Sequence, residues 1–149
     1  MKRSFFFALV GFFSLLLIVS ARVSSGNDAV SLDVQVVHAS SGKTFVDPTL
    51  VSLREKLVRL FNYSSFEIIS RARKRAQKGE TAQFSIPGNR NMNIVPVDAS
   101  GDVVRLDVVI GGVKSSMVRT ALKMERGSIV MVGGPEFQSG VLIILISAD

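Results

Sequence analysis

The sequence contains no cysteine, no tryptophan and a single histidine among its 149 residues. Without cysteine the chain cannot be a disulfide scaffold, an iron–sulfur protein or a thiol enzyme. The lone His38 also argues against a zinc site, which normally takes three or four protein ligands. We interpret His38 as an ordinary residue at a strand end, and we expect neither a metal nor a cofactor.

Charged residues are also scarce, at 20% of the chain against 47% hydrophobic residues. This balance is too apolar for a disordered chain, and the length suits one domain. Twelve acidic residues are scattered along the sequence. They show no spacing typical of a paired catalytic site, and Ser64-Ser65 and Ser115-Ser116 do not lie in a nucleophile-elbow pattern. We therefore predict that the protein is not an enzyme.

The N-terminus has the three parts of a secretory signal peptide. Lys2 and Arg3 precede an uncharged run from Phe5 to Ser20, and Ala21 supplies a small residue for cleavage. The alternative, an uncleaved membrane anchor, is less favoured because sixteen residues fall short of the roughly 20 needed to span a bilayer. We predict a signal peptide at 1–21, a flexible leader at 22–29 and a single domain at 30–149.

Export determines how the remaining charge is interpreted. Loss of Lys2 and Arg3 leaves 16 basic against 12 acidic residues, so the mature chain carries +4. The expected location is periplasmic or extracellular, where a nucleic-acid partner is not expected.

Hydrophobic spacing predicts one helix and a series of strands. Residues 30–38 alternate as a half-buried strand, and Asp47-Pro48 then opens an amphipathic helix that ends near Asn62. Short strands separated by turn signals follow. Their expected ranges are 63–69, 81–86, 91–97, 104–110, 118–124, 129–132 and 141–146.

The last of these strands, VLIILI at 141–146, is apolar on both faces. Such a strand is usually central and covered on both sides. A helix on one face and a second sheet on the other would cover it, although a homodimer could complete the burial instead. The predicted class is α+β: a mainly antiparallel sheet, forming a small sandwich or half-barrel of about eight strands, with one amphipathic helix after the first strand.

A basic run lies between the helix and the 81–86 strand. Its members are Arg71, Arg73, Lys74, Arg75 and Lys78. The sequence leaves open whether the run is strand or helix, and either geometry concentrates positive charge. Two interpretations remain: a binding site for anionic lipid headgroups or acidic glycan, and an edge strand whose charges discourage aggregation.

Gly133, Gly134 and Pro135 form the strongest break signal in the C-terminal part. We interpret them as a structural turn that ends the 129–132 strand, because adjacent glycines and proline mostly serve turns.

Four segments resemble small exported bacterial proteins of unknown function: DPTL, FNYSSFEIIS, FSIPGNRNMNI and GSIVMVGGPEFQSGVLIILISA. Within the last of them, GSIVMVGG also resembles the strand ending in Gly-Gly of outer-membrane secretin channels, although the continuation typical of secretins is missing. The resemblance implies a role in envelope assembly.

Together these features predict an exported, non-enzymatic envelope protein that acts as a protein-interaction or assembly module. Its expected partner is another envelope protein, bound by strand addition at a sheet edge, and a homo-oligomer is also compatible with the sequence. The alternative is a polyanion-binding module that uses the Arg71 to Lys78 run.

Overall fold

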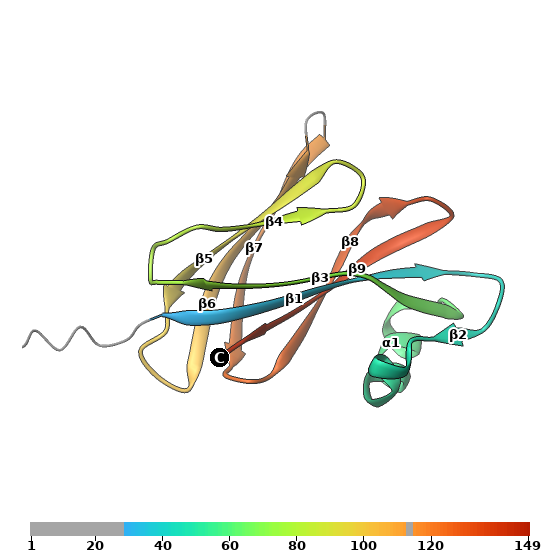
Figure 1. Ribbon diagram of the computed structural model, residues 1–149, viewed down its shortest axis with the longest axis horizontal. Coiled ribbons are helices and arrows are strands. Elements are labelled where there is room, and N and C mark those ends of the chain that lie inside the picture. The colour runs from blue at the N-terminus through green and yellow to red at the C-terminus, as the bar shows by residue number, and fades with distance from the viewer. Residues whose placement is uncertain (1–28, 113–114) are drawn as a thin grey trace, which may run out of the picture.

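The computed structural model describes residues 29–112 and 115–149 (Figure 1). The predicted signal peptide and all but the last residue of the predicted leader lie outside the described residues. The elements, in chain order, are β1 Val30–Ser40, β2 Phe45–Val46, η1 Pro48–Leu53, α1 Arg54–Phe61, β3 Ser65–Ala76, β4 Ala82–Ile86, β5 Arg90–Asp98, β6 Val103–Gly112, β7 Ser115–Glu125, β8 Ile129–Phe137 and β9 Gly140–Ala148.

Two sheets build the fold. One has five strands in the order β2-β3-β1-β9-β8, and the other has four in the order β4-β5-β6-β7. Every pairing is antiparallel except that of the two-residue strand β2 with β3. The predicted class, an α+β half-barrel or sandwich with a helix after the first strand, is confirmed.

The main core lies between the two sheets. Its buried side chains alternate along each strand, as the two-residue period of a strand requires. From the first sheet it takes Val30, Leu32, Val34 and Val36 of β1 and Leu142, Ile144 and Ile146 of β9; from the second it takes Phe84, Met92, Ile94, Val104, Leu106 and Val108.

A smaller core lies on the outer face of the five-stranded sheet, where the helix packs. Leu57 of α1 and Leu50 of η1 meet Val37, Phe66 and Ile143 there. The side chains of β9 from Leu142 to Ile146 are therefore buried on both faces within one chain, as a central strand requires. The second sheet covers one face and the helix the other, so a dimer is not needed to complete this burial.

The helix covers only one end of that outer face. Along β1 the outward side chains change from Ser31, Asp33 and Gln35 to Val37 and Ala39, and only the last two lie in the smaller core. Figure 1 shows the helix and β2 at one end of the long strands. At the other end of the outer face, no described element covers the polar side chains of Ser31, Asp33 and Gln35.

The start of the helical segment agrees with the sequence. Asp47 is the N-cap, and its Oδ1 accepts hydrogen bonds from the Thr49 amide at 2.9 Å and the Thr49 hydroxyl at 2.6 Å. The first turns are 3₁₀ and become an α-helix only at Arg54. Asn62 then closes the helix in the left-handed region, at φ 30°.

The predicted turn at Gly133, Gly134 and Pro135 is wrong. These residues lie inside β8, which continues to Phe137, and its pairing with β9 shifts register between Gly133 and Glu136. A bulge in the strand accommodates the proline, which cannot donate to the ladder. Gly134 is needed because a Cβ there would lie 2.8 Å from the carbonyl oxygen of Leu142.

Candidate functional site: the free edge of β3

Four of the five residues of the basic run, from Arg71 to Arg75, lie on a strand and not on a helix. β3 runs from Ser65 to Ala76 and pairs with β1, with one irregularity at Ile69, which has no partner on β1; the register is regular from Ser70 to Ala76. On its other side β2 pairs only with Ser65 and Phe66, and the Asp47 amide donates to the Phe66 carbonyl at 2.9 Å. Within the described residues, no strand pairs with this side of β3 from Glu67 onward. We call residues 67–76 the free edge.

The register identifies the backbone groups that point out along the free edge. Ser31 exchanges both of its backbone hydrogen bonds with Asp149, at 2.7 and 3.0 Å, on the β9 side of β1. It therefore has none left for Arg75, its partner on β3, and this is a non-hydrogen-bonded pair. The N–H and C=O of Arg75 must point away from β1. By the alternation of an antiparallel ladder, those of Arg73 and Arg71 do the same.

The side chains of these three arginines lie on the outer face of the sheet, as expected for a strand. Arg73 donates from Nε and Nη2 to one carboxylate oxygen of Asp33, at 3.0 and 2.7 Å. Arg71 donates from Nη2 to the Thr49 hydroxyl at 2.6 Å. The Arg73–Asp33 contact is the one ion pair among the described residues, and the Arg73 side chain is still 72% exposed. The outer face therefore keeps an excess of positive charge.

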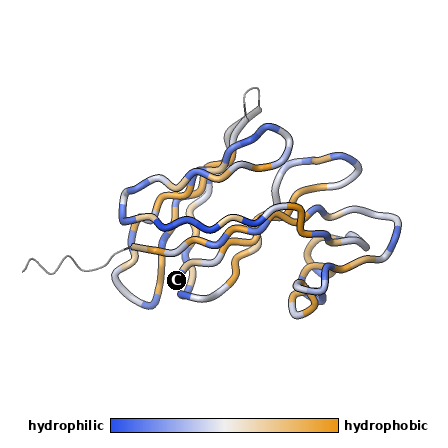
Figure 2. Tube along the Cα trace, viewed as in Figure 1, coloured by the Kyte–Doolittle hydropathy of each residue, from blue (hydrophilic) through white to orange (hydrophobic). Residues whose placement is uncertain are grey.

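The other two predicted basic residues do not join this face. Lys74 points to the opposite side, where its Nζ lies 5.6 Å from the centre of the Phe84 ring. Lys78 lies in the turn after β3. Its charge lies near Asp98, whose pKa is lowered chiefly by hydrogen bonds from Ser100 and to a lesser degree by Lys78 and Arg105. Figure 2 shows the hydrophilic stretch that β3 forms along the sheet.

Asp47 marks the end of the free edge next to the helix. Hydrogen bonds from the Thr49 hydroxyl and amide lower the pKa of its carboxyl group, and the charge of Arg71 adds a smaller effect. The Thr49 hydroxyl therefore links Asp47 to Arg71, because it donates to the first and accepts from the second. This contact fixes the Arg71 side chain at one end of the basic face.

His38 and the acidic residues form no metal-binding group in the part of the chain that the structure describes. Among residues 29–112 and 115–149, no three His, Cys, Asp or Glu side chains come close enough to hold a metal ion. His38 packs its ring edge-on against Phe137, with 5.6 Å between centroids. Its Nε2 is buried and has no hydrogen-bond partner in the part of the chain that is described. No helix there is long and apolar enough to cross a membrane.

Two hollows formed by the described residues were not predicted from the sequence. One is an apolar cavity beside Arg90, where β5 and β8 approach each other. The other is an amide-rich depression on the four-stranded sheet, lined by Gln83, Asn91 and Asn93. Arg90 follows the turn residues Pro87, Gly88 and Asn89, so the sequence signals only the turn. Its approach to Pro135 depends on long-range pairing that no local pattern encodes.

Comparison with known proteins yields no matching family model, curated protein or solved structure.

Proposed function

We propose that this protein is an exported, non-enzymatic interaction module of the cell envelope that binds an extended, acidic segment of another protein by strand addition along β3. The observation that carries the proposal is the free edge itself. From Ser70 to Ala76 it is a regularly paired strand, and the outward N–H and C=O groups of Arg71, Arg73 and Arg75 have no strand partner among the described residues. The pattern of residues 1–21 supports export.

The geometry specifies what the partner strand must look like. A strand that bonds to the outward groups of Arg71, Arg73 and Arg75 places a residue directly opposite each arginine, on the same outer face. Opposite charges favour such cross-strand pairs, and like charges oppose them. The partner should therefore carry Asp or Glu at every second position. Asp33 already pairs with Arg73, and Arg71 donates to Thr49 beside the Asp47 carboxylate, so Arg75 offers the most available charge.

A second candidate function rests on the common orientation of the three arginines. Their side chains form a basic face that could attract a lipid headgroup or an acidic glycan through charge alone. Binding of that kind uses side chains and leaves the backbone edge unpaired. Strand addition requires the backbone, so the two functions can be separated by removing one outward N–H group.

The test compares Arg73→Pro with Arg73→Ala. Both remove the same charge, but only proline also removes the outward N–H group. Proline is tolerated on an edge strand when its nitrogen faces outward, so the fold should survive. The probe is a labelled synthetic peptide with Glu at every second position and Thr or Val between, followed by fluorescence anisotropy. A peptide of the same composition with its Glu residues in one block is the control.

We expect Arg73→Pro to bind the alternating peptide at least about tenfold more weakly than Arg73→Ala, because a backbone bond and close approach are lost together. The blocked peptide should bind more weakly than the alternating one. If the two variants and the two peptides behave alike, binding depends on charge alone. That result overturns strand addition and favours the polyanion function, which heparin and anionic vesicles would then test directly.

Amide hydrogen exchange gives a second readout that needs no variant. The amides of Arg71, Arg73 and Arg75 should exchange quickly in the free protein, because they face solvent. Saturation with the alternating peptide should slow all three. Absence of this protection at saturation would refute strand addition even if the peptide binds. Lys74→Pro checks the register. Its N–H faces β1, so the substitution removes a ladder hydrogen bond and should destabilise the fold by about 1 to 3 kcal/mol.

A further inference from the structure

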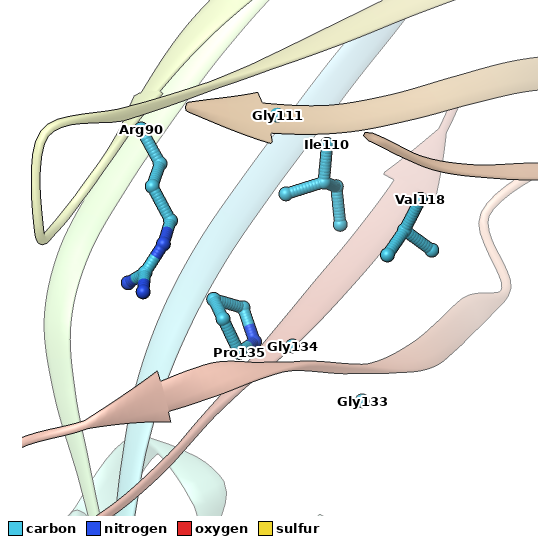
Figure 3. A pocket seen from close by; sticks show the side chains of 7 residues that line it. All are labelled: Arg90, Ile110, Gly111, Val118, Gly133, Gly134 and Pro135. Carbon is cyan, nitrogen blue, oxygen red and sulfur yellow. The ribbon is translucent and has the colours of Figure 1, made fainter. Parts of the chain in front are cut away.

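A cavity of about 160 Å³ lies at one end of the sandwich, where β5, β6 and β7 of one sheet meet β8 of the other. Ile110 and Val118 line it from the four-stranded sheet, and Pro135 lines it from β8. Figure 3 shows their side chains directed toward a common space, which the Arg90 side chain enters from the other side. The cavity is separate from the free edge of β3.

The bulge in β8 provides one wall of this cavity. The register shift between Gly133 and Glu136 moves this part of β8 out of regular pairing. Gly134 has no side chain to fill the space, and its backbone lies too close to Leu142 to accept one. Pro135 has no N–H group to satisfy. The lining is therefore mostly apolar.

Arg90 is the exception. Its side chain is only partly exposed, and no hydrogen bond or ion pair engages its guanidinium within the described residues. The guanidinium lies over Gly88, so that a Cβ on that residue would be 2.6 Å from Nη1. Gly88 has φ 86°, and the absence of a side chain there lets the arginine lie toward the cavity. A partly buried guanidinium without an anion is unfavourable, and its planar donors match a carboxylate.

The volume limits the size of the apolar group that fits. A cavity of about 150 Å³ lined by apolar side chains accepts a benzene ring. The space beside Arg90, at 160 Å³, is comparable. We propose that this cavity binds a small apolar carboxylate, with an aromatic or branched aliphatic group between Ile110, Val118 and Pro135 and its carboxylate on Arg90.

Benzoate, benzamide and acetate are suitable probes. Benzamide keeps the ring without the charge, and acetate keeps the charge without the ring. Each is titrated into ¹⁵N-labelled protein while amide chemical shifts are followed. A ligand this small should bind with a Kd on the order of 1 mM. We expect saturable shifts for benzoate at Gly111, Gly133 and Gly134, and binding at least about tenfold weaker for benzamide and acetate.

Arg90→Gln should weaken benzoate at least about tenfold and leave benzamide unchanged, because only benzoate uses the charge. Arg90→Lys, which keeps the charge without the planar fork, should fall between. Val118→Phe should weaken both ligands by filling the cavity, and folding should tolerate it because Val118 is 54% exposed. Arg105→Gln and Val97→Phe are the matched controls away from the cavity, and neither should change binding.

Two results would overturn the proposal. Equal binding of benzoate and benzamide, or an unchanged benzoate affinity in Arg90→Gln, would remove the role of Arg90. Shifts that increase linearly without saturation, or that spread over exposed basic residues, would show that no site exists. A preserved spectrum in each variant confirms that the loss is not caused by unfolding.

Discussion

Leu57 should hold the helix on the sheet, and its removal gives a measurable loss of stability. Leu57 is fully buried and packs in the smaller core, whereas Leu60 of the same helix is 56% exposed. The two residues have the same side chain in one short helix, so they form a matched pair. We compare Leu57→Ala with Leu60→Ala.

The magnitude follows from the packing. Leu-to-Ala changes at buried sites cost about 2 to 5 kcal/mol, depending on how far the surroundings close over the cavity. α1 covers one end of a sheet and can move toward it, so we expect a loss of about 3 kcal/mol for Leu57→Ala. Leu60→Ala removes surface that is already largely hydrated, and its effect should stay within about 0.5 kcal/mol.

Urea unfolding at equilibrium, followed by circular dichroism, measures both variants. With an m value of about 1.5 kcal/mol/M, the midpoint should fall by about 2 M for Leu57→Ala and by less than about 0.5 M for Leu60→Ala. Equal shifts in the two variants would refute the reasoning, because they would mean that the helix does not depend on the Leu57 contact. A changed m value in Leu57→Ala alone would indicate that the helix detaches before the sheets unfold.

Three further predictions concern backbone and turn contacts. Gly140→Ala should destabilise the fold by at least about 2 kcal/mol, because the new Cβ would overlap the Ala39 carbonyl oxygen. The control is Gly101→Ala, which has nothing within 4 Å of its Cβ position and should change stability little in the same thermal unfolding assay. Arg126→Met should lower the free energy of unfolding by about 1 to 2 kcal/mol, since Arg126 donates to the carbonyl oxygens of Ala99 at 2.6 Å and Gly101 at 2.9 Å. An unchanged free energy of unfolding by calorimetry would show that these hydrogen bonds do not stabilise the fold. Asp47→Ala should lower the melting temperature near neutral pH, because hydrogen bonds from Thr49 stabilise the charged Asp47 carboxylate of the wild type. The difference in melting temperature should disappear as pH falls through the lowered pKa of the Asp47 carboxyl. A difference that does not change with pH would contradict this.

The sequence predicted the layered architecture because hydrophobic spacing is a local signal. The run at 141–146 indicated a strand covered on both faces, and the fold provides a helix on one side and a sheet on the other. Asp47 and Pro48 correctly marked the helix start. These features depend on residues close in the chain, whose period and capping chemistry can be read directly.

The errors and omissions arise where distant segments meet. Gly133, Gly134 and Pro135 form a turn pattern locally, but pairing with β9 holds them in a strand as a bulge. The basic run was ambiguous because arginine and lysine suit both helix and strand surfaces, and only pairing with β1 determined its conformation. The sequence around Arg90 indicates only a turn, because the position of Arg90 beside Pro135 depends on how the two sheets meet.

The two proposed sites should act independently, and this provides the last prediction. The free edge of β3 belongs to the five-stranded sheet, whereas Arg90 enters its cavity from β5 of the four-stranded sheet. Among the described residues the two sites share no residue and no strand, so binding at one site should not change affinity at the other. Arg73→Pro should leave benzoate binding unchanged, and Arg90→Gln should leave binding of the alternating acidic peptide unchanged, in the same titrations.

If Arg90→Gln weakens binding of the peptide as much as it weakens binding of benzoate, the peptide carboxylates occupy the Arg90 cavity, and the peptide result no longer supports strand addition. If instead Arg73→Pro weakens benzoate, that ligand binds the basic face of β3 and the cavity is not its site.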